Sequence, residues 1–344
     1  MAFDQRVTAD TPARPGRGRR GVGALFLLAL ALVLLLWWLL SYAVGPGPAT
    51  DRTLVYIPPG SSFTAIEEEL VAAGVLAPDR RFRWLATLGG QRRQLKAGEY
   101  AVAAATTPWQ LLNQLVAGRV HQRRVTIPEG SHIQQVARRL ADAKLLAAED
   151  FIALAGDPAT AAAFELDSPT LEGWLFPDTY RFTRGQPPEE IIGVMVRRAQ
   201  RVLDELLAEL GNDTGLDRRE IMTLASIVEK EAALAAERPL IAGVFFNRLE
   251  RGMRLQTDPT VSYGLQAFER RLTRQDLRTP TPYNTYHITG LPPGPIANPG
   301  RAAIAAVLEA AETDYLYFVS RNDGSHHFST NLREHNRAVQ RYQR

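Results

Sequence analysis

The stretch DRREIMTLASIVEKE, residues 217–231, predicts a helix that starts at a capping pair and ends in two acids. Asp217 and Glu220 have the spacing of a capping box, and apolar residues follow at positions 221, 224, 225 and 228. Glu229 and Glu231 both adjoin this apolar face. Partial burial disfavours the charged form of a carboxyl group and raises its pKa, which suits a general acid near neutral pH.

The helical pattern alone leaves two questions open. Charged residues commonly solvate the last turn of a helix, so a Glu-Lys-Glu end is weak evidence for catalysis by itself. Periodicity also does not distinguish Glu229 from Glu231. The segments on either side of this helix are needed to interpret it.

Two upstream stretches repeat a strand, a turn and a helix at an offset of 70 residues, VYIPPGS at 55–61 and VTIPEGS at 125–131. In each copy a β-branched strand ends at a Pro-x-Gly turn, and apolar residues then follow at helical spacing. Ser61 and Ser131 are placed to cap the two helices. Two copies are too few for a solenoid.

The first copy continues through a second helical stretch at 78–88 and a strand at 99–102. This predicts a small β-α-α-β subdomain, which we assign to residues 51–120. The arrangement is similar to LysM modules, which bind the N-acetylated sugars of chitin and peptidoglycan. A short unit of this kind is also a common way to close a small core, so the topology is compatible with a purely structural role.

Residues 21–44 form an uncharged, leucine-rich stretch of 24 positions. As a helix rising about 1.5 Å per residue it reaches roughly 36 Å, enough to cross a hydrocarbon core of about 30 Å. Trp37, Trp38 and Tyr42 lie near its end, as expected for side chains that favour the headgroup boundary. The stretch therefore predicts a single transmembrane helix.

Five arginines precede this helix, so the positive-inside bias places residues 1–20 in the cytoplasm and the rest outside. Residues 45–50, with two prolines, are expected to form a short linker. The alternative is a cleaved signal peptide, because residues 41–43 resemble a cleavage site. We favour an uncleaved anchor, since the apolar run is longer than a usual signal core and the preceding tail is long.

Composition excludes several other classes of protein. A formal net charge of +3 with dispersed arginines does not predict a nucleic-acid surface. The 344 residues include no cysteine, so disulfides, thiolate nucleophiles and cysteine zinc sites are excluded. We therefore expect no nucleic acid as a partner, and stability that comes from packing.

The part of the chain after residue 120 mixes helical and strand patterns. Residues 189–210 carry one apolar stripe at helical spacing and end at Gly211. Residues 315–319 and 327–329 read as two strands of a hairpin. The sequence thus predicts an α+β protein, with a mixed α/β domain over residues 121–344.

Three polar, turn-forming stretches follow the helix at 217–231, at residues 255–261, 281–286 and 290–294. Loops of this kind supply hydrogen-bonding groups and aromatic faces for a sugar ring. The candidate substrate-binding residues are Glu231, Gln256, Asp258, Tyr283, Asn284 and Tyr286.

A more specific resemblance rests on several long motifs in order. They are LEGWLFPDTY (171–180), LASIVEKE (224–231), FNRL (246–249), GMRLQTDPT (252–260), YNTY (283–286) and GLPPGPI (290–296), followed by His326, Phe328, His335 and Asn336. These motifs resemble the signature stretches of the YceG-like family of endolytic murein transglycosylases, also called MltG. The resemblance extends from the membrane segment to the end of the chain.

The resemblance implies an endolytic peptidoglycan lytic transglycosylase of the bacterial inner membrane, with its C-terminal domains in the periplasm. Such an enzyme cleaves the β-1,4 bond between MurNAc and GlcNAc without water and leaves a 1,6-anhydromuramyl end. It also implies that Glu229, the first acid of the VEKE stretch, is catalytic and acts without a cofactor. Nascent glycan strands are the expected substrate, and peptidoglycan synthases are candidate partners because they make these strands at the membrane.

Other functions are compatible with parts of the sequence. A non-catalytic, membrane-anchored peptidoglycan-binding scaffold would need only the LysM-like unit. A pyridoxal-phosphate lyase would need a Schiff-base lysine, and Lys230 is the one lysine in the motif region. The histidines at 326, 327 and 335 have none of the usual zinc spacings, so we expect no metal site.

The anchor can be tested on the intact chain. A C-terminally tagged protein should stay at full length in the membrane fraction after alkaline extraction, because residues 21–44 span the bilayer. Immunoblotting of both fractions measures this. A shortened, soluble product would identify residues 21–44 as a cleaved signal instead.

Overall fold

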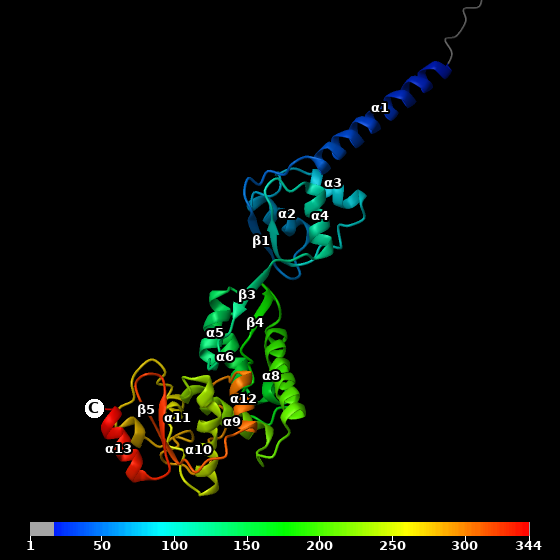
Figure 1. The fold of residues 1–344 in the computed structure, drawn as a ribbon. Coiled ribbons are helices and arrows are strands. Elements are labelled where there is room, and N and C mark those ends of the chain that lie inside the picture. The colour runs from blue at the N-terminus through cyan, green and yellow to red at the C-terminus, as the bar shows by residue number, and fades with distance from the viewer. Residues whose placement is uncertain (1–16, 344) are drawn as a thin grey trace, which may run out of the picture. The chain divides into compact units, whose positions relative to one another are not determined.

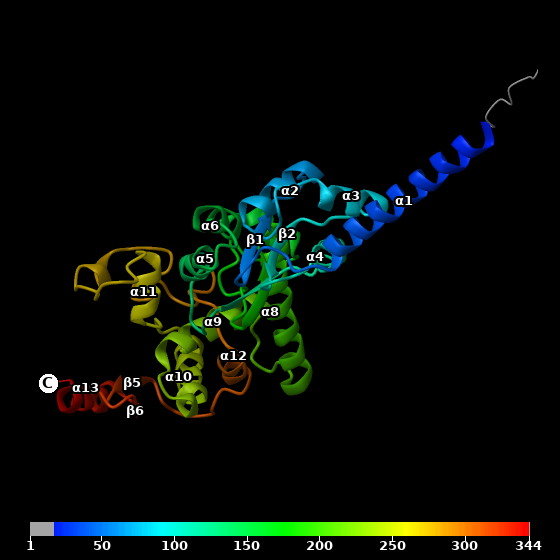
Figure 2. The same cartoon turned by 90° about the horizontal axis from the view of Figure 1, so that it is seen from above.

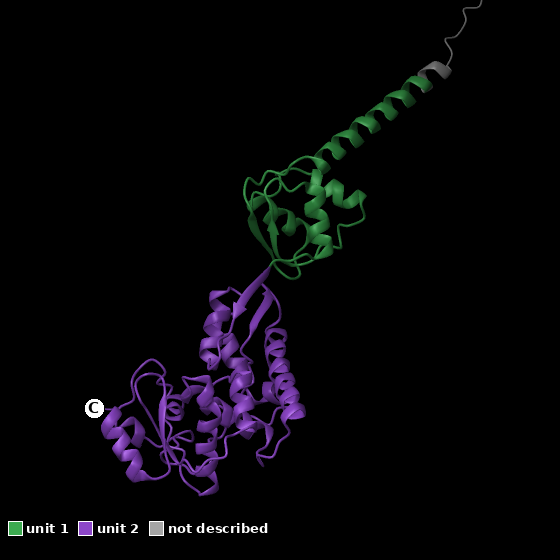
Figure 3. Cartoon of the chain, viewed as in Figure 1, with its two compact units in different colours: residues 1–121 green, residues 122–344 purple. Residues whose placement is uncertain are grey.

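The computed structural model describes residues 17–343, with side chains from Val22 onward. The chain divides into two compact units, residues 1–121 and 122–344 (Figure 3). The expected cytoplasmic tail, residues 1–20, lies outside the residues whose side chains are described.

Unit 1 begins with the long helix α1 (Arg17–Val44). Its segment Val22–Val44 is long and apolar enough to cross a membrane, with a mean hydropathy of 2.7, and nearly all its side chains are exposed. The last turn differs, since Tyr42 and Ala43 are buried in the core of unit 1. A single apolar helix of this kind is compatible with a single-pass anchor.

The rest of unit 1 has the predicted order of strand, two helices and strand, and a third helix follows. The elements are β1 (Thr53–Ile57), α2 (Phe63–Ala72), α3 (Arg81–Leu88), β2 (Gly98–Val102) and α4 (Pro108–Ala117). β1 pairs with β2 in an antiparallel sheet, with Val55 opposite Tyr100. Ile57, Phe82 and Tyr100 are completely buried, so this small unit has a core of its own.

The two repeated turns differ from the sequence prediction in one respect. Ser61 and Ser131 do not cap the following helices, because each hydroxyl donates to the carbonyl of the proline three positions earlier, at 2.8 and 2.7 Å. The N-cap residues are instead Ser62 and His132. The serines close the Pro-x-Gly turns on themselves, so the predicted caps were wrong by one residue.

Unit 2 is mostly helical and contains two small antiparallel sheets, β3–β4 and β5–β6. Its strands are β3 (Gln122–Thr126), β4 (Thr179–Thr183), β5 (Tyr317–Ser320) and β6 (His326–Ser329). Its α-helices are α5 (Ile133–Asp142), α6 (Ala148–Gly156), α7 (Pro158–Ala163), α8 (Pro188–Leu210), α9 (Arg218–Glu231), α10 (Arg238–Glu250), α11 (Asp258–Gly264), α12 (Arg301–Leu308) and α13 (Leu332–Tyr342). Two short 3-10 helices are η1 (Ala235–Glu237) and η2 (Asp276–Arg278). The mixture of helices and sheets agrees with the predicted α+β class.

Helix α9 is the centre of unit 2. It packs against α10, α11 and α12, and every residue from Ile221 to Val228 is buried (Figure 1). The predicted capping box is present, since Asp217 accepts from the Glu220 amide at 2.8 Å and Glu220 accepts from the Asp217 amide at 2.9 Å. The core therefore fixes α9 along its length, and its last turn carries Glu229 and Glu231 to the edge of that core.

The C-terminal hairpin was also predicted correctly. β5 pairs with β6 so that Phe318 lies opposite Phe328. Phe318 meets Phe245 of α10 edge to face, with ring centroids 5.9 Å apart. Figure 2 shows β5, β6 and α13 together at one end of the unit, next to α10.

Candidate active site

Glu229 lies where three helix ends meet. Its side chain is only 7% exposed. One carboxylate oxygen is 3.3 Å from Nη2 of Arg238, at the start of α10, and the other accepts a hydrogen bond of 3.1 Å from the amide of Gly300. Gly300 is the N-cap of α12, so both donors lie at helix N-termini. A guanidinium and a helix N-terminus both stabilise negative charge, so this carboxylate is well held.

The second repeated turn presses directly against this carboxylate. Gly130 has a left-handed φ of 69°, and a Cβ there would lie 3.7 Å from Cγ of Glu229. A Cβ at Gly300 would collide with the carboxyl of Glu129, whose Oε2 is 3.9 Å from Nη2 of Arg238. At Gly130 it is the left-handed φ that favours glycine, whereas at Gly300 a larger residue would have to displace the side chain of Glu129.

Two open hollows lie beside the end of α9. The Lys230 hollow, of about 490 Å³, is lined by residues that include Gly130, His132, Lys230, Asp258, Tyr263 and Arg271. The Glu231 hollow, of about 580 Å³, is lined by residues that include Glu231, Gln256, Asp258, Tyr286, His326 and His335. Asp258 lines both hollows, whereas Glu229 lines neither. Concave, partly polar surface of this extent can hold a chain of sugars.

Four of the residues predicted from sequence come together in the Glu231 hollow. Burial raises the pKa of the Glu231 carboxyl, against the opposing effect of a hydrogen bond from the Thr257 hydroxyl. The Tyr286 hydroxyl donates to Asp258 at 2.8 Å. Gln256 adopts a left-handed φ of 47°, a conformation that non-glycine residues seldom adopt.

The other two predicted residues lie behind this surface. Asn284 is completely buried; its amide group donates to carbonyls of residues 277 and 279, and its oxygen accepts from the Tyr286 amide. The ring of Tyr283 packs on that of Tyr263, with centroids 4.8 Å apart. Both residues thus hold the loop that presents Tyr286.

Motif 246–249 also serves the scaffold. The Asn247 amide group donates to the carbonyls of residues 313 and 315 at 2.6 and 2.9 Å. Arg248 is buried and donates to the carbonyls of residues 316 and 255 at 2.7 and 2.6 Å. These contacts join α10 to the C-terminal hairpin and to the segment that leads into α11.

Glu172, to which sequence analysis gave no role, is a buried carboxyl that joins several segments. It accepts from the amide of Ile133 at 3.1 Å and from the side chain of Asn298 at 3.2 Å, and it hydrogen bonds to Tyr263. Asn298 in turn donates to the carbonyl of Ser131 at 2.7 Å. Burial raises the pKa of Glu172 to about 8, despite these hydrogen bonds. The only sequence signal for it was its place in motif 171–180.

Within residues 17–343, no group of three or more His, Asp or Glu side chains is arranged to hold a metal ion. His326 is paired with Glu237 instead, with Nδ1 2.7 Å from the carboxylate. Independence from metals stays a prediction.

Comparison with known proteins places these motifs in a family. Residues 55–341 match the model of the YceG-like family. This chain belongs to the YceG-like family.

Curated relatives of this chain are named as enzymes. The chain is 33% identical over 304 residues to the endolytic murein transglycosylase of Bacillus subtilis strain 168, covering 84% of each protein. It is 30% identical over 317 residues to the endolytic murein transglycosylase of Streptococcus pneumoniae strain D39, covering 83% of this chain and 57% of that protein.

A solved structure has the same YceG-like fold. The crystal structure of a putative YceG-like protein from Listeria monocytogenes aligns with a TM-score of 0.58 at 33% identity. The alignment covers 84% of this chain and all of that one.

The buried Glu172 should make stability fall as pH rises. Its folded pKa of about 8 exceeds the ordinary value of 4.5, so between these values the folded state keeps a proton that the unfolded state releases. The free energy of unfolding should then fall by about 1.4 kcal/mol per pH unit in this window. Glu172→Gln should remove this contribution.

Urea unfolding at several pH values, followed by tryptophan fluorescence, measures the effect. Glu149→Gln, a matched change on the exposed face of α6, should keep the wild-type slope. An unchanged slope in Glu172→Gln would show that Glu172 ionises normally in the folded protein.

Proposed function

We propose that this chain is an endolytic peptidoglycan lytic transglycosylase that cleaves the MurNAc–GlcNAc β-1,4 bond of nascent strands and so terminates their elongation. The observation that carries the proposal is Glu229, a nearly buried carboxylate whose next two residues in the chain, Lys230 and Glu231, each line an open hollow. The relatives named endolytic murein transglycosylases support this class of activity.

Glu229 acts twice in the proposed reaction. In its protonated form it donates to the glycosidic oxygen, which leaves with the GlcNAc residue as the bond from C1 of MurNAc breaks. As a carboxylate it then takes the proton of the C6 hydroxyl while O6 bonds to C1, which closes the 1,6-anhydro ring. The proton returns to Glu229, so the reaction consumes no water. It also needs no second carboxylate, whereas most glycosidases use one as nucleophile or as the base that activates water.

The neighbours of Glu229 suit the second of these steps. The Gly300 amide and the Arg238 guanidinium both donate to a carboxylate, which is the form that accepts the C6 proton. For the first step Glu229 must carry a proton, so we expect a bound strand to displace Arg238 from it. Once displaced, Arg238 can pair with Glu129 instead, because Oε2 of Glu129 is 3.9 Å from Nη2 of Arg238.

Asp258, Tyr286, Gln256 and Glu231 are the proposed contacts for the strand, because all four line the Glu231 hollow. Tyr283 and Asn284 support the loop behind them and act on substrate through Tyr286. A strand bound in the Glu231 hollow passes Asp258, which also lines the Lys230 hollow.

The proposed setting is the periplasmic face of the bacterial inner membrane. The exposed apolar helix Val22–Val44 supports a single-pass anchor, with residues 1–20 in the cytoplasm, a linker at 45–50 and the domains 51–120 and 121–344 outside. An enzyme held there meets strands as they leave the peptidoglycan synthases, which are the proposed protein partners.

Loss of the Glu229 acid should abolish cleavage without unfolding the protein. Glu229→Gln keeps the size of the side chain but removes the proton that the leaving oxygen needs, so activity should fall by at least a thousandfold, roughly. Mass spectrometry of digested glycan should then show no anhydromuramyl ends, while Glu149→Gln should form them at the wild-type rate. Wild-type products with hydrated reducing ends would identify a hydrolase instead.

We also propose that the β-α-α-β subdomain binds glycan in the manner of LysM modules, on the basis of its element order. In the Glu229→Gln background, deletion of residues 51–120 should weaken sedimentation with purified sacculi. If the protein sediments equally with sacculi with and without the subdomain, the subdomain does not bind glycan and acts only as a spacer. If the wild-type protein cleaves glycan and the deletion leaves sedimentation unchanged, the result would favour an enzyme over a non-catalytic binding scaffold.

A further inference from the structure

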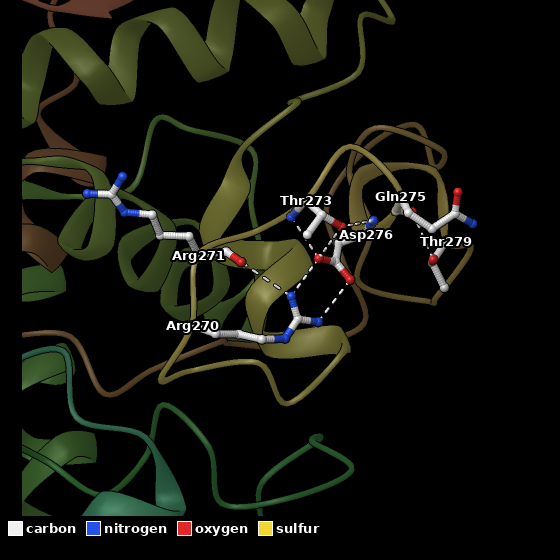
Figure 4. A network of polar contacts seen from close by, with 6 residues as sticks. All are labelled: Arg270, Arg271, Thr273, Gln275, Asp276 and Thr279. Carbon is white, nitrogen blue, oxygen red and sulfur yellow. Dashed lines mark hydrogen bonds and ion pairs between the residues drawn. The ribbon is translucent and has the colours of Figure 1, made fainter.

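The loop at residues 268–279 has a fixed shape because one carboxylate organises it. Asp276 accepts hydrogen bonds from Nη1 and Nη2 of Arg270, at 2.6 and 2.9 Å, and from the amide and hydroxyl of Thr273, at 2.7 and 2.8 Å (Figure 4). The hydrogen bonds from Arg270, followed by those from Thr273, hold the pKa of Asp276 well below its usual range. The charge of Arg270 is therefore neutralised within the loop.

The neighbouring Arg271 is presented differently. In Figure 4 its guanidinium points away from the Asp276 cluster, and only its backbone carbonyl takes part, as an acceptor from Arg270. Arg271 lines the Lys230 hollow together with Lys230, whose ammonium donates to the uncharged carbonyl of Gly130 at 3.2 Å. No carboxylate among the described residues pairs with either cation.

The other titratable groups of the hollow do not cancel these charges. Burial lowers the pKa of His132, so its ring is neutral near pH 7. Asp258 is the one carboxylate among the residues that line the hollow, and one of its oxygens already accepts from Tyr286. The Lys230 hollow is thus net positive, with a partly apolar wall at Phe268.

Glu229 lines neither hollow itself, but Gly130, which lines the Lys230 hollow, lies close to it. A Cβ at Gly130 would lie 3.6 Å from Nζ of Lys230 and 3.7 Å from Cγ of Glu229, so this glycine lies between the two side chains. Gly130 thus links the hollow to Glu229, and a muramyl ring bound at Glu229 would carry its substituents toward Gly130 and Lys230.

We propose that the Lys230 hollow binds a carboxylate of the peptide stem carried by the muramyl residue, and that Arg271 is the residue that recognises it. This inference rests on the proposed function and adds a specificity for strands that still carry acidic stems. The volume of about 490 Å³ accommodates a short peptide rather than a single ion. The hydrogen bonds to Asp276 order the backbone beside Arg271, which lowers the cost of ordering this loop on binding.

The test compares Arg271→Gln with Arg274→Gln, an exposed arginine of the same loop that lines neither hollow. Three glycans are used: strands with intact stems, strands whose stem carboxyls have been amidated, and strands freed of stems, which carry a lactyl carboxylate. On intact stems Arg271→Gln should lose roughly tenfold in kcat/KM, mainly through KM, as expected for one charge-assisted hydrogen bond. On amidated stems it should equal the wild type, and Arg274→Gln should equal the wild type on all three.

An equal loss on all three glycans, or no loss on any, would overturn the proposal. A loss confined to the stem-free strands would assign the hollow to the lactyl carboxylate instead and would also overturn it. The same comparison, made as glycan affinity in the Glu229→Gln background, requires no cleavage. Stem recognition and transglycosylase activity can therefore fail independently of each other.

Discussion

The carboxylate of Glu229 is held between the amide of Gly300 and the guanidinium of Arg238, and the surrounding fold brings these three groups together. They come from the end of α9 and the starts of α12 and α10. Each helix places a different part of the proposed site: α9 supplies the proposed catalytic acid, whereas α10 and α12 supply the donors that stabilise its charge. The packing of α10 and α12 on α9 is therefore the condition for the proposed chemistry.

Further hydrogen bonds hold the turn at residues 128–131, which lies next to Glu229. Asn298 hydrogen bonds to Ser131 and to the buried Glu172, and its backbone carbonyl accepts from the amide of Gly130. Glu172 is joined to the start of α5 through the amide of Ile133. A buried carboxyl with a raised pKa is a costly element for a structural role alone, but in its protonated form it is both a donor and an acceptor at this junction.

Local patterns could be predicted from the sequence because they depend on near neighbours. The capping box at Asp217, the long helix at 188–210 and the C-terminal hairpin each follow from spacing within a few residues. The choice between Ser61 and Ser62 as a cap could not be made, since it depends on which carbonyl the hydroxyl reaches once the turn has formed. The long-range contacts of the site were also inaccessible. Gly300 lies 71 positions from Glu229, and nothing in the pattern of either segment indicates that they meet.

The most direct test of the account is a structure of the Glu229→Gln protein with a glycan oligomer bound. The account predicts a strand that passes Asp258 and places one glycosidic oxygen within about 3.2 Å of the side chain at position 229, with Arg238 moved away from it. A strand seated elsewhere, with residue 229 still held by Gly300 and Arg238 and far from any glycosidic oxygen, would contradict it.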